Sequence, residues 1–152
     1  AAATAKAPRR RNLLVVFMNP PFFEAALYLC SHLAYSTNKN LKLVSSTLLL
    51  NYTTFLIKEG ITDDVYQPTP LLNVINALLV ETKPQSDDAV FRLAISVGSL
   101  HMFSKIAQER TKSLIDLLNQ HAEALKAATP PLSEHSKVAL AELASLLGSH
   151  ST

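Results

Sequence analysis

The chain has 152 residues, 48% of them hydrophobic, which is enough for one domain with a sizeable core. Fourteen Lys and Arg against twelve Asp and Glu leave a net charge of +2, too small for nucleic-acid binding across the whole surface. The single Cys30 excludes an internal disulfide, and the lack of a charge-free run of about twenty apolar residues argues against a membrane span. Only three glycines and long Leu/Ala runs favour an all-α chain, which we expect to be cytoplasmic or nuclear.

The first part of the chain predicts a short tail followed by two helices. We assign residues 1–8 to the tail, and Pro8 suits the first turn of the helix that follows. Three consecutive arginines, 9–11, span most of a turn, so we expect only one of them to face a binding groove. The Asn19-Pro20-Pro21 step predicts a break, after which a helix runs from about Pro21 to Tyr35.

The longest predicted helix covers residues 40–60. Thr37 or Asn38 is its expected N-cap, and Gly60 is its expected stop. One polar stripe follows this helix, formed by Asn40, Thr47, Asn51, Thr54 and Lys58. A polar amide on such a stripe either ties down a neighbouring loop or contacts a ligand, and the sequence leaves both interpretations open.

The central stretch of the chain is the helix predicted from Asp87 to Leu100, capped by Ser86 or Asp87. A loop at 61–70 and a helix at 71–82 precede it. Its polar residues form one narrow stripe, made of Asp88, Arg92, Ser96 and Ser99. The remaining residues are nearly all apolar or small, so Arg92 requires either water or an acidic partner. We place it on the floor of a groove; the alternative is an arginine paired inside the protein.

Three further helices are predicted at 104–110, 111–128 and 134–147, with a Thr129-Pro130-Pro131 break and a tail at 149–152. About eight helices in units of nearly forty residues are typical of an α-solenoid of helix pairs or triplets. A compact irregular bundle is the alternative, because no clean internal repeat is visible.

No catalytic pattern is present in the sequence. The five histidines are scattered without a zinc motif, and phosphate-binding and nucleophile-elbow motifs are missing. Cys30 and His32 are two residues apart and so face different directions on a helix. We therefore expect no enzyme activity, no metal and no cofactor, which leaves binding as the function.

Three motifs resemble the PUL domain, the C-terminal module of the phospholipase-A2-activating-protein family and of some fungal thioredoxin or deSUMOylase-like fusions. They are Asn38–Leu41 running into Ser46–Tyr52, then Phe91-Arg92-Leu93 with Val97–Leu100, and Arg11–Phe17. The resemblance covers residues 9–148. It implies that the N-terminal part of a full PUL domain is missing from this chain.

This resemblance implies an armadillo-like α-solenoid whose helices line a concave, basic groove. It implies binding of the C-terminal tail of a valosin-containing-protein-class AAA ATPase, and a role as an adaptor in ubiquitin-dependent turnover. The groove residues that it implies are Arg11 and Arg92, with Lys39 and Asn51 near the same surface; Ser96 joins them as part of the Arg92 stripe. The family usually has an asparagine four residues after the first arginine, where this chain has Val15.

Two other classes of function are open at this point. One is a structural scaffold with internally paired arginines, which supports a fused enzyme domain or self-associates through an uncovered solenoid end. The other is a nucleic-acid binder that uses Arg9–Arg11, which the lack of interleaved aromatic residues disfavours. We expect a protein partner rather than nucleic acid or membrane.

Overall fold

The computed structural model describes residues 20–60, 68–80 and 85–150, and every regular element in these ranges is a helix. The six helices are α2 (Pro20–Ala34), α3 (Lys39–Lys58), α4 (Thr69–Leu79), α5 (Asp87–Phe103), α6 (Lys105–Lys126) and α7 (Glu134–His150). The all-α prediction is confirmed over these ranges.

The helices begin and end where local sequence signals predict. The side chain of Asn38 accepts hydrogen bonds from the backbone N–H groups of Asn40, at 2.8 Å, and Leu41, at 3.3 Å, at the start of α3. Ser86 caps α5 in the same way, through the N–H of Ala89 at 3.3 Å. Gly60 follows α3 with a φ of +65°, a conformation that favours glycine.

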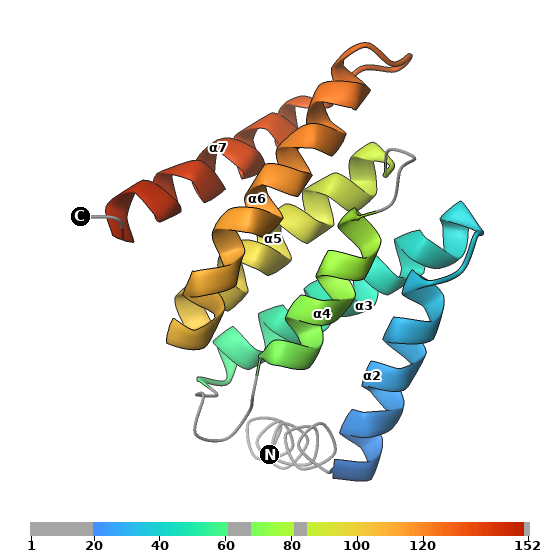
Figure 1. Cartoon of the computed structure of the whole chain (residues 1–152), viewed down its shortest axis with the longest axis vertical. Helices are drawn as coiled ribbons and strands as arrows, with labels where there is room; N and C mark the ends of the chain where they lie inside the picture. Colours follow the sequence, from blue (N-terminus) through green and yellow to red (C-terminus); the bar gives the residue numbers. More distant parts are fainter. Residues whose placement is uncertain (1–19, 61–67, 81–84, 151–152) are drawn as a thin grey trace, which may run out of the picture.

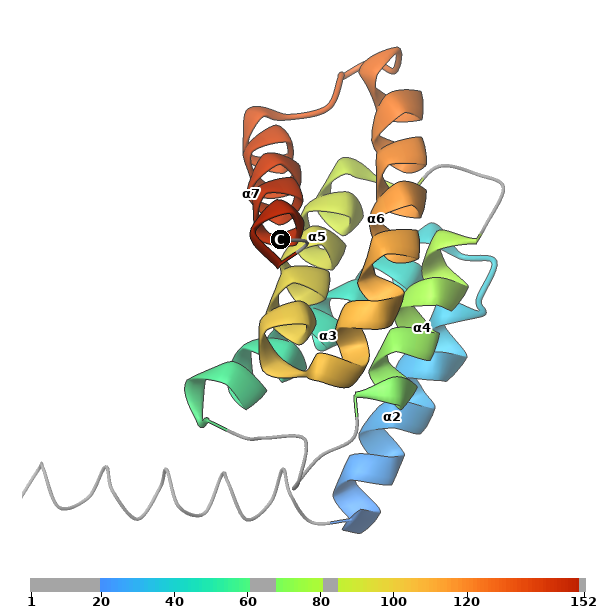
Figure 2. The same cartoon turned by 60° about the vertical axis from the view of Figure 1, so that its left-hand side comes forward.

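The helices form two layers, and each antiparallel hairpin has one helix in each layer. One layer contains α2, α4 and α6, and the other contains α3, α5 and α7, as Figures 1 and 2 show. The helices within each layer run in the same direction, and each pair consecutive in sequence crosses between the layers. The predicted solenoid is thus built from helix pairs.

The predicted count of eight helices is too high for the described residues. The helix expected over 9–18 lies outside them, and the two expected at 104–110 and 111–128 are a single helix, α6. Thr111 does not interrupt α6, because its hydroxyl donates to the carbonyl of Gln108 at 3.1 Å within the same helix. Nor does Gly148 end α7, which continues to His150.

The central helix is α5, which packs against α3, α6 and α7. Its inward side chains join the main core; the largest fully buried aliphatic residues include Leu49, Leu56, Leu72, Ile75, Leu93, Leu100 and Leu118. Cys30 also belongs to this core, and burial raises the pKa of its thiol. Among the described helices, none is long and apolar enough to cross a membrane.

Candidate functional site

One stripe of α5 stays in contact with solvent between its packed sides. It consists of Asp88, Arg92, Ile95, Ser99 and Met102, which recur at spacings of four and three residues and are each exposed or partly exposed. We call these five residues the α5 stripe. α3 and α7 flank this helix in the same layer (Figure 2), so the stripe lies on the outer surface of the α3–α5–α7 layer.

Ser96 does not share the stripe with Arg92, although the sequence spacing placed it there. Its side chain is fully buried, and its hydroxyl donates to the carbonyl of Arg92 at 2.9 Å. A step of four residues turns 40° beyond a full helical turn, which carries Ser96 inward and leaves Ile95 on the surface. The partly exposed position after Arg92 is therefore apolar.

Arg92 has the most unusual environment in the stripe. Its side chain is partly buried, and its Nη1 atom is enclosed without a hydrogen-bond partner among the described residues. Those residues also offer it no carboxylate within ion-pair distance. A buried polar group without a partner costs about 1–3 kcal/mol, more if it is charged, so the described residues leave this cost uncompensated at Nη1. The internally paired arginine of the alternative interpretation has no partner in the part of the chain that the structure describes.

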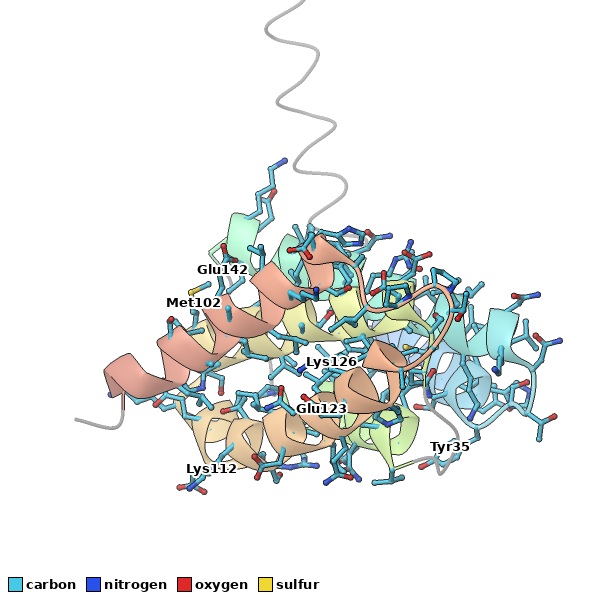
Figure 3. The ribbon with its side chains drawn as sticks, turned by 90° about the horizontal axis from the view of Figure 1, so that it is seen from above. Tyr35, Met102, Lys112, Glu123, Lys126 and Glu142 are labelled. Atoms are coloured by element: carbon cyan, nitrogen blue, oxygen red, sulfur yellow. The ribbon has the colours of Figure 1, made fainter. Side chains whose placement is uncertain are left out.

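Three other basic side chains, on α6 and α7, do have partners. Lys126 pairs with Glu123 and Lys137 pairs with Glu134, each within one helical turn. Both lysines line a cavity of about 540 Å³ between α6 and α7, and Figure 3 shows Glu123 and Lys126 there. Arg110, on α6, donates to the side-chain oxygen of Asn73 at 2.8 Å. Arg92 differs from these three residues because its Nη1 is enclosed and has no hydrogen-bond partner among the described residues.

A polar junction fixes the start of α5 against the start of α7. The Asp87 carboxylate accepts hydrogen bonds from the N–H and the hydroxyl of Ser133, at 2.9 and 3.0 Å. Burial alone would raise the pKa of Asp87, but these bonds and the nearby His135 hold it below its usual value. The ring of His135 also meets Phe91 edge-on, with centroids 4.7 Å apart. The junction fixes the position of α5 one turn before Arg92.

The same junction brings Asp87, Asp88 and His135 close enough to offer one metal-ligand atom each within 4.8 Å. One oxygen of Asp87 already accepts two hydrogen bonds, and the positive ends of α5 and α7 meet here. Positive helix ends disfavour a cation, so the junction is best explained as a structural contact.

The remaining predicted site residues lie in other places. Asn51 is exposed and lines an apolar cavity of about 440 Å³ between α2 and α3, together with Leu29, Leu48, Tyr52 and Phe55. Lys39 is exposed at the first position of α3, twelve residues before Asn51 and so about 18 Å away along the axis. Arg11 lies outside the described residues.

Among the four predicted residues that the structure describes, Ser96 contacts Arg92, through a hydrogen bond from its hydroxyl to the Arg92 backbone carbonyl. Sequence reasoning missed Ile95 and Met102, which take the exposed positions of the α5 stripe. A strict four-then-three spacing starting at Asp88 could have found both of them, since it passes through 92, 95, 99 and 102.

One of three comparisons with known proteins gave a match. The family model of the PUL domain matches residues 8–145. Searches of curated proteins and of solved structures gave no match. Because the matched segment includes all of α2 to α6 and most of α7, the chain belongs to the PUL domain family.

Proposed function

We propose that this chain is a non-catalytic peptide-binding adaptor of the cytoplasm or nucleus. Its ligand is the C-terminal tail of a valosin-containing-protein-class AAA ATPase, and its role lies in ubiquitin-dependent protein turnover. PUL domains are protein-interaction modules, which supports the general class. The observation that carries the proposal is the partly exposed Arg92 of α5, whose Nη1 has no hydrogen-bond partner among the described residues.

A peptide carboxylate fits this environment chemically. A guanidinium holds carboxylates through paired N–H donors, and such charge-assisted bonds contribute about 1.5–3 kcal/mol each. Partial burial strengthens the attraction, because solvent screens it less than at the open surface. A bound tail would thus provide the hydrogen-bond acceptor that the described residues do not offer Arg92.

Binding of a labelled tail peptide to the wild-type chain and to Arg92→Ala tests this function. We expect micromolar binding by the wild type and at least a tenfold loss in Arg92→Ala, because one charge-assisted bond alone is worth that factor. Arg110→Ala is the matched control, since Arg110 lies on α6 and pairs with Asn73. Equal binding by Arg92→Ala and the wild type would refute the proposal.

A peptide whose tyrosine is phosphorylated gives a second check. We expect it to bind more weakly, because the phosphate adds nearly two negative charges and bulk that a partly buried position must accommodate. Equally tight binding by the phosphorylated peptide would contradict the expected mode.

A structural scaffold that self-associates is the second candidate. It is favoured by apolar side chains exposed on α2 and α3, namely Tyr28, Leu29, Leu41 and Val44, of which Leu29 also lines the 440 Å³ cavity. Sedimentation analysis over a hundredfold concentration range distinguishes the two candidates. A dimer that Leu29→Lys dissociates, in a chain without peptide binding, would favour the scaffold.

A further inference from the structure

Met102 is a large apolar residue exposed near the end of the α5 stripe. Its exposed fraction is 58%, whereas Ile95 on the same stripe packs partly against the core. Methionine is flexible and polarisable, which suits it to surfaces that accept apolar partners. The stripe therefore has a cation at its centre and an uncovered apolar group at its far end.

The neighbouring helix carries a second exposed apolar residue at the same end of the layer. Ile57 is 38% exposed and lies next to the last residue of α3. Because α3 and α5 pack side by side and run in the same direction (Figure 1), their C-terminal ends lie at the same end of the layer. Met102 and Ile57 thus add two apolar side chains to the surface there.

Charged residues favour one orientation of a ligand bound along the α5 stripe. Glu142, from α7, lies on the same side of the molecule as Met102, whereas Lys112 projects on the α6 side (Figure 3). α7 passes beside this part of α5, since a Cβ added to Gly98 would meet Leu143 at 3.6 Å. A carboxylate on the side of the molecule where Met102 lies disfavours an anionic group there, so the anion of a ligand belongs at Arg92 and its uncharged part at Met102.

The distance from Arg92 to Met102 sets how many peptide residues separate the anionic group of a ligand from its apolar side chain. Ten residues of helix separate Arg92 from Met102, about 15 Å along the axis. An extended peptide covers that distance in four or five residues, at about 3.3 Å each. Only Ile95 and Ser99 lie between them on the stripe, and neither carries a charge that would repel the passing chain.

We infer that the peptide recognised at Arg92 carries a large apolar side chain four or five residues from its anionic group, and that Met102 and Ile57 bind this side chain. The inference rests on the proposed function and adds to it a second binding position and a spacing rule. The occupant is a single extended peptide with one anionic end and one apolar residue, running along α5 from Arg92 toward Met102.

Four peptides of equal charge test the spacing in the full chain. Each has a free C-terminal carboxylate in a Gly/Ser background, with one leucine two, five or nine residues before the C-terminus, or with none. We expect the wild type to bind the five-residue peptide about tenfold more tightly than the peptide without leucine, since partial burial of the leucine and of Met102 is worth about that factor.

The variants separate this inference from the proposed function. Met102→Gln and Ile57→Gln should each reduce the preference for the five-residue peptide, and Arg92→Ala should weaken all four peptides. Val80→Gln is the matched control, because Val80 is equally exposed, at 57%, but follows α4 in the other layer. If leucine position has no effect while Arg92→Ala weakens every peptide, the inference is wrong and the proposed function stands. If the folded wild type binds none of them, or Arg92→Ala binds them as tightly, both are wrong.

Discussion

His121 and Arg92 are two polar side chains on packed helices, and they differ in how fully the protein satisfies them. Nδ1 of buried His121 accepts the backbone N–H of Gln85 at 3.0 Å. Its Nε2 therefore carries the hydrogen and donates to the carbonyl of Leu79 at 2.7 Å. Both ring nitrogens have partners, whereas Nη1 of Arg92 has none among the described residues.

The region around His121 therefore contributes to stability, whereas we propose that the α5 stripe contributes to binding. The His121 region joins α6 to both ends of the connection between α4 and α5, with support from the side-chain amide of Gln85, which donates to Leu78. The α5 stripe instead holds a partly buried guanidinium whose Nη1 has no partner among the described residues. A polar group that is fully paired stabilises the fold, and one that is left unpaired is available for binding.

The largest effect on stability is expected for His121→Ala, which should lower the free energy of unfolding by about 2–4 kcal/mol. The substitution leaves a buried N–H and a buried carbonyl without partners and also creates a cavity. Urea unfolding measures the change. His32→Ala is the control, because His32 is exposed on α2 and stacks only against Tyr28. A loss below about 1 kcal/mol would show that water replaces the imidazole and would remove the contrast with Arg92.

Asp87→Asn should have a smaller effect, about 1 kcal/mol at pH 7, by removing the charge that Ser133 and His135 stabilise. The pKa of Asp87 is lower in the folded chain than its ordinary value of 3.8. The stability that ionised Asp87 contributes is therefore fully present above pH 3.8, and it is lost as the pH falls through the lower pKa of the folded chain.

Urea unfolding of both chains between pH 7 and pH 2 measures this contribution. The stability difference between the wild type and Asp87→Asn should vanish at the acidic end. Asp88→Asn controls for the helix dipole, since Asp88 lies in the same first turn but is exposed. A difference that persists unchanged at pH 2 would mean that the carboxylate charge contributes nothing to the junction.

The smallest effect on stability is expected for Arg92→Met, which should change the free energy of unfolding by less than about 1 kcal/mol and in the stabilising direction. It removes a buried donor that has no partner among the described residues, and it keeps the apolar part of the side chain. Thermal unfolding measures it, and peptide binding should be lost in the same variant. A destabilisation of several kcal/mol would instead indicate that Arg92 is structurally paired, as the scaffold interpretation requires.

Local signals account for most of the helix boundaries that the sequence predicted well. Asn38, Ser86 and Gly60 act on the backbone within three residues of themselves, so their effect does not depend on the rest of the fold. The junction between 104–110 and 111–128 was predicted wrongly, because a threonine that could cap a new helix remains inside α6, 2.8 Å from the ring of His101.

The site was less predictable than the helices. Periodicity identified Arg92 as a polar residue on a mostly apolar helix, but it could not decide whether a distant carboxylate reaches it. It also placed Ser96 on the surface, where the structure has Ile95, because the packing of α3 and α7 determines which edge of the stripe is covered. Asn51 belongs to a cavity that exists only where α2 meets α3.

The amino-acid sequence is enough to predict the all-helical class, the caps and breaks, the central position of the α5 segment and the resemblance to the PUL domain. These follow from short-range backbone chemistry and from the order of motifs along the chain. Three features are visible only in the folded chain: His121 is paired, Nη1 of Arg92 has no partner among the described residues, and Met102 is exposed. Pairing and coverage depend on groups 36 to 42 residues apart, as in the His121 contacts, and such distances are set by packing rather than by local sequence.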